Sequence, residues 1–434
     1  VLGLVMDYEI DSRILALAVA RMVDALANSF LVVVLPLYIG SQVVALPNFI
    51  GAEIALGSVT FTLTPELLIG LVLSLFGFLN SFGQPFTGAV SDRSGKRKIF
   101  LLTGLALVAV GSAGYIFFTS YIAVLFMRAL QGIGAAFTIP ITVALVNELS
   151  GAEDRGGNFG LFNTFRLLGF GTGPLVAGGV VAAGPYQFRT LSISGFDAAF
   201  LVAVIGATVS FLLISVLISD PERTDDTAAE DISIRIRGKD GNGLDSVFAL
   251  GIATVVMALG LAIYAPLANI INARLDQGTF LFSIQFGATV FANVFFQLPI
   301  GRLSDQYGRR PFLIGGFIVL VPSTLAQGFV QSSILMIAAR FIQGIAVAAV
   351  FAPSLALAGD LAKEGQSGST LSLLTMGFSL GIAFGTLFSG ILVGFGYAVP
   401  FITATLLSVG GLVLVYTQVG ESTEPTPETP VPSD

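Results

Sequence analysis

The sequence contains no cysteine, no histidine and no tryptophan among its 434 residues. Without cysteine, the chain has no disulfide, no thiolate metal site and no thiol nucleophile. Without histidine, proton transfer near neutral pH must rely on a carboxylate whose pKa is shifted by its surroundings. These absences exclude most hydrolytic and metal-dependent chemistry, and we expect no metal site.

Charge is also scarce. Only 11% of the residues are charged, whereas 54% are hydrophobic; a typical soluble domain has about 25% charged residues. The apolar content suffices for about ten to twelve spans of about 20 residues, each crossing a hydrocarbon core of about 30 Å. Soluble enzymes, nucleic-acid binders and disordered scaffolds are excluded, and continuous apolar runs argue against a β-barrel. We predict an all-α membrane protein whose partner is the lipid bilayer, with no nucleic acid.

Apolar runs between charged breaks predict twelve transmembrane helices. Their expected ranges are 13–39, 65–90, 99–118, 121–147, 157–182, 197–219, 246–272, 279–303, 311–330, 333–358, 368–394 and 397–418.

The polar stretch 220–245 divides these spans into six plus six. We expect an N-terminal bundle over 1–219, a cytoplasmic linker over 220–245 and a C-terminal bundle over 246–418. The proline-rich, acidic tail 419–434 is expected to be disordered. The outer stretch 40–64 is expected to form a short re-entrant or interfacial piece without an assigned function.

The positive charges predict the orientation of the chain. Fourteen of the 20 Lys and Arg residues lie in the turns after spans 2, 4, 8 and 10, in the linker, at Arg13, and at Arg302 at the end of span 8. The turns on the other side hold only Arg189 and Arg274. By the positive-inside rule both termini are cytoplasmic. The acid-rich, lysine-poor composition favours a salt-loving prokaryote, so we predict a multi-pass protein of the cytoplasmic (inner) membrane.

An internal repeat relates the two predicted bundles. GAVSDRSGKR at 88–97 returns as GRLSDQYGRR at 301–310, 213 residues later. RALQG at 128–132 returns as RFIQG at 340–344, at an offset of 212. Collinear matches at nearly the same offset also pair Pro140 with Pro353, and Gly169, Gly173 and Gly178 with Gly381, Gly385 and Gly390. The halves are therefore copies of one six-helix unit.

The chain resembles the major facilitator superfamily over nearly its whole length. The G-x-x-x-D-R-x-G-R/K-R/K pattern occurs at 88–97 and again at 301–310, where Gln306 replaces its first arginine, and R-x-x-Q-G is a second motif of that family. The resemblance implies two six-helix bundles around a central cavity, which move a small molecule by alternating access. It also implies a monomer without cofactors, with protons as the coupling ion.

A third motif in span 5 is similar to the antiporter motif of proton-coupled drug exporters, with Ala177 in place of a glycine. At 100° per residue, Gly169 and Gly173 lie within about 40° of each other, and small residues let a neighbouring helix approach closely. Pro174 adds a kink. Generic transmembrane packing is the alternative interpretation. The motif residues are Gly160, Gly169, Gly173, Pro174 and Gly178.

The resemblance also implies a conformational latch in the turns after spans 2 and 8. Glycines permit a tight loop there, and Asp92 can accept hydrogen bonds from a helix N-terminus or an arginine. Simple charged anchors of topology are the alternative. The latch candidates are Gly88, Asp92, Arg93, Gly95, Arg97, Gly301, Asp305, Gly308 and Arg309.

Charges inside the spans are the sharpest functional signal. Asp24 is the only acid clearly inside a span, and it shares one helical arc with Arg21 and Asn28. Counting about 1.5 Å per residue, we expect Asp24, Arg128 and Arg166 at about the same depth. Charges there cost several kcal/mol unless they are paired or lined by water, so they should face the central cavity. A structural salt-bridge network is the alternative.

These charges support two interpretations. Asp24 beside Arg128 would form the proton-coupling site, and Asp24 followed by Leu35-Pro36 resembles the first span of tetracycline-type exporters. Alternatively, the arginines bind an anionic substrate, because guanidinium groups suit carboxylate or phosphate. The substrate-binding candidates are Arg21, Asn28, Asn163, Arg166, Asn269, Asn293 and Gln297.

We therefore predict a secondary active transporter, with proton-coupled efflux of a drug-like or amphipathic compound as the first interpretation. An organic-anion uptake or exchange carrier is the alternative. An enzyme is rejected, because the spans carry no nucleophile–base pair, metal cluster or phosphate loop. The second half has no acid at mid-depth, so proton coupling is expected in the first half.

Overall fold

The structure is a computed structural model that describes residues 11–41, 43–56, 59–150, 155–189, 191–220, 243–361 and 367–420. Within these residues, 12 helical segments are long and apolar enough to cross a membrane, which confirms the predicted all-α membrane fold. The elements are α1 (Ser12–Gly40), β1 (Glu53–Leu56), β2 (Val59–Thr62), α2 (Pro65–Ser94), α3 (Arg97–Phe117), α4 (Tyr121–Leu149), α5 (Arg155–Ala183), β3 (Tyr186–Phe188), β4 (Leu191–Ile193), α6 (Gly195–Leu217), α7 (Ser246–Ala262), η2 (Ala265–Leu267), α8 (Ala268–Arg274), α9 (Thr279–Tyr307), α10 (Arg309–Gln327), α11 (Ser333–Leu361), α12 (Ser367–Leu392), η3 (Val393–Phe395) and α13 (Val399–Gln418).

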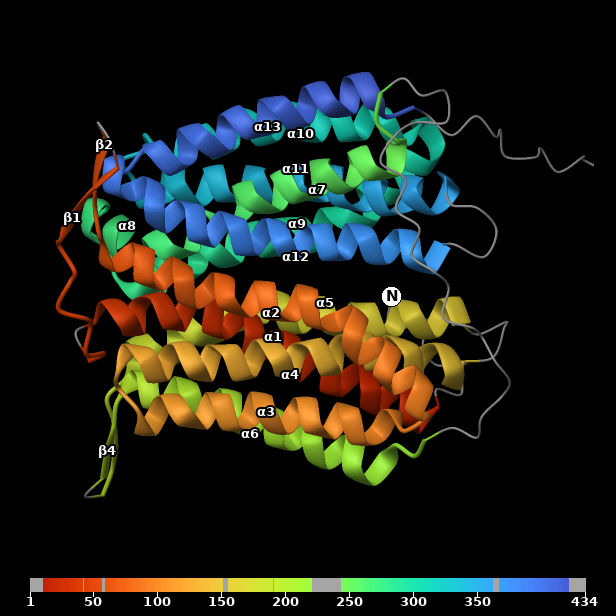
Figure 1. Cartoon of the computed structure of the whole chain (residues 1–434), viewed down its shortest axis with the longest axis horizontal. Coiled ribbons are helices and arrows are strands. Elements are labelled where there is room, and N and C mark those ends of the chain that lie inside the picture. Colours follow the sequence, from red (N-terminus) through yellow and green to blue (C-terminus); the bar gives the residue numbers. More distant parts are fainter. Residues whose placement is uncertain are drawn as a thin grey trace, which may run out of the picture.

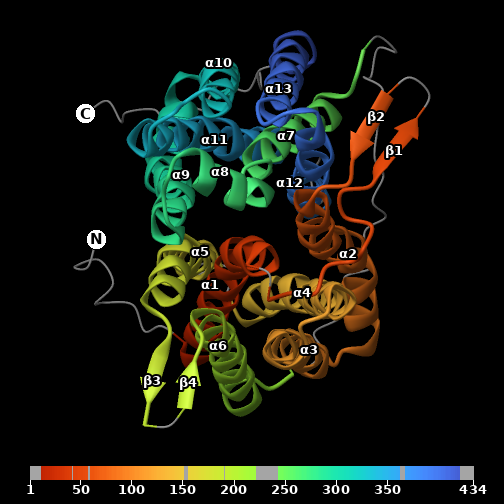
Figure 2. The same ribbon diagram turned by 90° about the vertical axis from the view of Figure 1, so that its left-hand side faces the viewer.

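The helices run side by side along the long axis of the molecule in two groups, α1–α6 and α7–α13 (Figure 1). Both strand pairs lie at one end of this bundle, which we call the hairpin end. The described chain begins and ends at the opposite end, which we call the terminal end. Figure 2, viewed from the hairpin end, shows the two groups of helices end-on.

Local sequence signals explain several helix ends. Thr64 caps α2 by accepting a hydrogen bond from the Leu67 amide, and Pro65 and Glu66 occupy the first turn, as expected. Asp11 caps α1, and hydrogen bonds from the Arg13 guanidinium hold the pKa of Asp11 below its usual range. These caps satisfy amides that the first helical turn leaves without intrahelical partners.

Two helices end later than the apolar pattern predicts. The helices α2 and α9 continue to Ser94 and Tyr307, four residues beyond the expected ends. They stop where Gly95 and Gly308 adopt φ values of +63° and +91°, which glycine tolerates best. The turn motifs therefore belong mostly to the last turns of helices.

Span 7 is interrupted, whereas the sequence predicts one helix over 246–272. The segment contains α7, the short η2 and α8 in succession. Pro266 stands at the break, where it removes a backbone donor and disfavours a continuous helix. Beyond the break, α8 lies at the hairpin end of the molecule (Figure 1).

The stretch 40–64 contains an antiparallel hairpin, β1–β2, where a re-entrant or interfacial piece was expected. Its β-branched and aromatic residues Val59, Thr60 and Phe61 favour strand over helix. A second hairpin, β3–β4, joins α5 to α6 and has no counterpart in the sequence prediction. Most of the expected linker (221–242) and tail (421–434) lies outside the described residues.

The halves meet along two seams, α2 with α12 and α5 with α9. Gly70 lies against the backbone of α12, where a β-carbon would come 2.5 Å from the Thr386 carbonyl oxygen. Gly178 lies equally tightly against Ser283 of α9.

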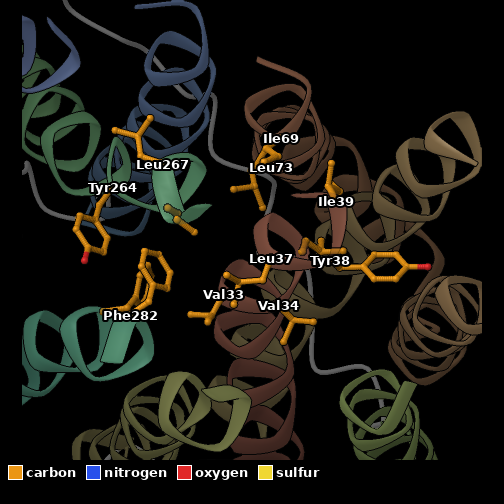
Figure 3. Close-up of a cluster of buried hydrophobic side chains, with 14 of the residues drawn as sticks. Val33, Val34, Leu37, Tyr38, Ile39, Ile69, Leu73, Tyr264, Leu267 and Phe282 are labelled. Carbon is orange, nitrogen blue, oxygen red and sulfur yellow. The ribbon is translucent and has the colours of Figure 1, made fainter. Parts of the chain in front are cut away.

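An apolar cluster joins the halves near the hairpin end. It contains Leu37 and Tyr38 from α1 together with Leu267 and Phe282 from the second half (Figure 3). These side chains are almost completely buried. Because apolar burial excludes water, the cluster seals this end between the halves.

Candidate functional site

A buried ion pair lies in the middle of α1. Arg21 Nη1 is 2.5 Å from Asp24 Oδ2, and both side chains are 13% exposed. Beside the pair is a cavity of about 10 Å³, lined by Leu101, Leu105 and Thr138 among others. That volume is about the size needed for one water molecule. The predicted intramembrane charges of α1 are thus paired with each other.

Arg128 is not beside Asp24, so that part of the prediction is wrong. Arg128 donates to Gln131 Oε1 at 3.0 Å and lies over the Phe76 ring at 4.2 Å. Asp24 instead lies beside Thr138, ten residues or about 15 Å farther along α4. The depth estimate failed because it assumed a span of about 30 Å, whereas α4 has 29 residues and extends about 43 Å.

The surroundings of Arg128 recur in the second half. Arg340 donates to Gln343 Oε1 at 2.6 Å and lies over the Tyr264 ring at 4.1 Å. Each glutamine also donates to a hydroxyl of the preceding helix at 3.0 Å, Gln131 to Ser112 and Gln343 to Thr324. This repetition favours a packing role, and the coupling role of Arg128 stays a prediction.

Arg166 on α5 has an amide partner. Its Nε and Nη2 donate to Asn163 Oδ1 at 3.0 and 2.9 Å. Within the described residues Arg166 forms no ion pair with a carboxylate. Arg21 is close enough to repel it electrostatically. The site therefore combines two arginines with one aspartate.

Two asparagines supply further polar atoms. Within the described part of the chain, the Oδ1 atoms of Asn28 and Asn293 are buried and have no hydrogen-bond partner. An unpaired buried carbonyl oxygen costs about 1–3 kcal/mol. Such atoms are therefore suited to accept hydrogen bonds from a bound molecule or from water.

Gln297 lies one turn beyond Asn293 on α9. Gly171 of α5 faces Val290 of α9, with 4.0 Å from a hypothetical β-carbon to Val290 Cγ1. From this contact, Arg166 lies about 7.5 Å and Gln297 about 10.5 Å toward the terminal end. These two predicted residues therefore lie at similar depths on helices of opposite halves.

Asn269 was predicted to bind substrate, but the structure places it elsewhere. Its Nδ2 donates to the Pro36 carbonyl oxygen at 2.9 Å, and its side chain lies against Gly40. The residue belongs to α8, beyond the break at Pro266. It therefore joins the halves at the hairpin end instead of lining the polar site.

The glycine pattern of α5 allows close helix packing. Gly169 lies against the Met22 carbonyl oxygen, and Gly173 lies against Ser29, so a β-carbon at either position would clash with α1. Pro174 is buried beside them. Gly160 differs, because no described atom lies within 4 Å of its hypothetical β-carbon. Close contact thus applies to part of the motif only.

The same packing recurs in the second half. Gly381 lies against the Val255 carbonyl oxygen, and a β-carbon at Gly385 would be 2.5 Å from the Leu259 carbonyl oxygen. Close packing of glycines on the first helix of the half is therefore a property of both copies of the repeat.

The predicted latch residues form ion pairs at the terminal end. Arg97 bonds Asp92 at 2.7 Å, and its Nε donates to Glu148 Oε2 at 2.8 Å. Arg309 lies 3.2 Å from Asp305 and 3.0 Å from Asp360. Glu148 and Asp360 are not among the residues predicted from the sequence, although their offset of 212 is that of the R-x-x-Q-G repeat in the same helices.

The glycines of the latch motifs divide into two kinds. Gly95 and Gly308 end their helices with positive φ. Gly88 and Gly301 instead lie inside α2 and α9 without close neighbours among the described residues, so their expected place in a tight loop is wrong. Arg93 is exposed on the last turn of α2.

The sequence model of the Major Facilitator Superfamily matches residues 17–240 and 250–433. The chain belongs to the major facilitator superfamily. This membership makes the protein a transporter and not an enzyme.

Two relatives and one solved structure are similar to this chain over most of its length. The quinolone resistance protein NorA of Staphylococcus aureus is 23% identical over 353 residues, which cover 80% of this chain and 86% of NorA. Multidrug resistance protein 2 of Bacillus subtilis is 25% identical over 352 residues, covering 80% and 85%. A bacterial homologue of the human lysosomal transporter Spinster, inward-facing and occupied, aligns with a TM-score of 0.71 at 13% identity, covering 93% and 94%.

Proposed function

We propose that this major facilitator protein exports an amphipathic or drug-like compound across the cytoplasmic membrane in exchange for protons, as a monomer. The observation that carries the proposal is the Arg21–Asp24 pair in mid-span, beside a cavity of water size. In a chain without histidine, Asp24 is the carboxylate placed to take up and release the proton. The names of the relatives NorA and Multidrug resistance protein 2 agree with efflux of drugs.

The pair offers a coupling mechanism. While Asp24 is ionised, it holds Arg21 by a charge-assisted hydrogen bond. A proton on Asp24 removes that attraction and leaves the Arg21 guanidinium available to another anion or to water. A proton on Asp24 thus favours binding of an anionic group to Arg21. A cationic or amphipathic cargo instead competes with the proton for the ionised carboxylate, and this competition is the linkage that an exchanger requires.

The proposed orientation places the terminal end in the cytoplasm. The halves then meet at the outer face, where Asn269 and the cluster around Leu37 and Leu267 join them. This arrangement corresponds to an inward-facing state. The ion pairs of Asp92 and Asp305 lie within their own halves. We propose that these aspartates engage the opposite half in the outward-facing state.

Transport in proteoliposomes tests the proposal. Asp24→Asn should abolish transport driven by a pH gradient but retain counterflow exchange of the cargo. Asp276→Asn is the matched control, because Asp276 is exposed at the hairpin end and its φ of +47° suits asparagine. Gradient-driven transport at the wild-type rate in Asp24→Asn would refute the assignment of Asp24.

A second candidate function is organic-anion uptake or exchange. It is favoured by Arg166, which has an amide partner and no carboxylate partner within the described residues. Thermal stabilisation of the purified protein by organic anions but not by drug-like cations would favour this function. The reverse pattern would favour export of cations.

A further inference from the structure

The duplication allows the two walls of the central site to be compared residue by residue. Gly169 packs on the Met22 carbonyl oxygen in the first half, and Gly381 packs on the Val255 carbonyl oxygen in the second. Residues of α1 are therefore equivalent to residues of α7 that lie 233 positions later. The offset is 212 between α5 and α12, and also between α4 and α11, where Arg128 repeats as Arg340 and the contact of Gly104 with Thr138 repeats as that of Gly316 with Val350.

These offsets show that the charged residues of the first half have uncharged equivalents in the second half. Arg21 and Asp24 correspond to Thr254 and Met257, so the ion pair is replaced by uncharged, buried side chains. Thr138 beside Asp24 corresponds to Val350, which precedes Phe351, and Arg166 corresponds to Phe378. Each charged position of the first half is thus uncharged in the second half, where the aromatic rings of Phe351 and Phe378 lie at or next to the equivalent positions.

The two phenylalanines touch each other. The rings of Phe351 and Phe378 lie 5.1 Å apart between centroids at an angle of 52°, and they join α11 to α12. Both side chains are half-buried, so part of each ring stays accessible. On α12 the adjacent Gly377 faces α7, with 3.2 Å from a hypothetical β-carbon to the Gly251 carbonyl oxygen. Phe378 therefore lies on the side of α12 toward α11.

We propose that the cargo is an aryl acid, which binds by its anionic group to Arg166 and Arg21 and by its aromatic ring to the Phe351–Phe378 pair. The first half carries two arginines against one aspartate, and guanidinium groups match carboxylate geometry. Ring faces and edges of the second half attract an aromatic cargo more than an aliphatic chain of similar size. The inference rests on the second candidate function, the transport of an organic anion through the central cavity.

Binding of four matched probes to the purified protein, measured by isothermal titration calorimetry without any gradient, tests the proposal. The probes are 2-naphthoate, its neutral amide, 2-naphthylmethylammonium and octanoate. Wild-type protein should bind 2-naphthoate about tenfold or more tightly than each of the others, because only 2-naphthoate satisfies both walls. Tighter binding of the ammonium probe would overturn the proposal.

Two variants test the phenylalanine side and the arginine side of the site separately. Phe378→Leu should weaken 2-naphthoate about threefold to tenfold and change octanoate less than about twofold, since only aromatic contact is lost. Arg166→Gln should weaken both acids about tenfold or more but leave the neutral amide unchanged. Phe329→Leu and Arg189→Gln are the controls, because both residues are exposed away from the site.

Further variants exclude damage to the fold. Phe378→Tyr keeps a ring and should keep the preference for 2-naphthoate over octanoate. If Phe378→Leu does not fold, Phe351→Leu carries the same expectation. If Phe378→Leu or Phe351→Leu changed the binding of all four probes equally, or of none, the ring pair would serve only to pack the helices and the proposal would be overturned. Proton coupling is tested separately by Asp24→Asn, so its failure would be distinguishable from failure of the binding pattern.

Discussion

Arg166 of α5 and Phe378 of α12 occupy equivalent positions, each three residues before a glycine that packs on the first helix of its half. One position holds a guanidinium bonded to Asn163, and the other holds a ring in contact with Phe351. The repeat has therefore kept the packing positions and changed the side chains at the positions of Arg166 and Phe378. We propose that these changed side chains select the cargo.

The Arg21–Asp24 pair should behave as one unit in stability measurements. Arg21→Gln should lower the free energy of unfolding by about 3–5 kcal/mol, because it leaves a buried carboxylate without its cation. The double variant Arg21→Gln with Asp24→Asn should recover much of that loss. A double-mutant cycle in detergent measures the coupling, and additive single effects would contradict the pairing.

The glycines of the antiporter-like motif should differ in their tolerance of alanine. Gly169→Ala should lower the free energy of unfolding by about 1–3 kcal/mol, since its methyl group meets the Met22 backbone. Gly160→Ala should be neutral or stabilising by about 0.5–1 kcal/mol, because it has open space and gains helix propensity. Thermal unfolding of both variants is the measurement, and equal losses would contradict the packing described.

Arg128 and Arg340 should respond alike to substitution, since their contacts are repeated. Arg128→Lys and Arg340→Lys should each lose the planar fork that reaches the glutamine and rests on a ring. We expect similar decreases in thermal stability and in transport rate. Loss of gradient-driven transport in Arg128→Lys alone, with counterflow retained, would instead support the predicted coupling role of Arg128.

The bond between Asn269 and Pro36 should bias the conformational equilibrium. Asn269→Ala removes one hydrogen bond between the halves, worth about 0.5–1.5 kcal/mol, and should shift the equilibrium about twofold to tenfold toward opening at the hairpin end. Since the chain has no cysteine, a single cysteine introduced at Val33 can report access to a water-soluble maleimide.

Asn272→Ala is the control for that measurement. Asn272 accepts a hydrogen bond from Gln277 at 3.1 Å within the second half. Labelling at Val33 should be unchanged in Asn272→Ala and faster in Asn269→Ala. Equal labelling in both variants would mean that the Asn269 bond does not hold the hairpin end closed.

The fold could be predicted from the sequence because its signals are local or repeated. Span length follows from apolar content, and the offset of 212–213 residues reveals the duplication without any coordinates. The pairing of Arg21 with Asp24 was also accessible, because residues three apart share a helix face.

Positions that depend on a helix break or on packing depth could not be predicted. Asn269 follows the interruption at Pro266, and an apolar run does not show where a helix breaks. Arg128 was placed at the depth of Asp24 because a span of about 30 Å was assumed, whereas the 29 residues of α4 extend about 43 Å. Glu148 was missed for another reason: an acid at the end of a span resembles an ordinary surface charge until its partner Arg97 is seen.

The glycine contacts between the halves have a mechanical consequence. At Gly70 and Gly390 the backbone of one half rests directly on the other, against Thr386 and Glu66. Where side chains interdigitate, they must separate before two helices can move past each other. At these glycine contacts few side chains stand between the helices, so the two halves can tilt against each other while the packing inside each half is kept.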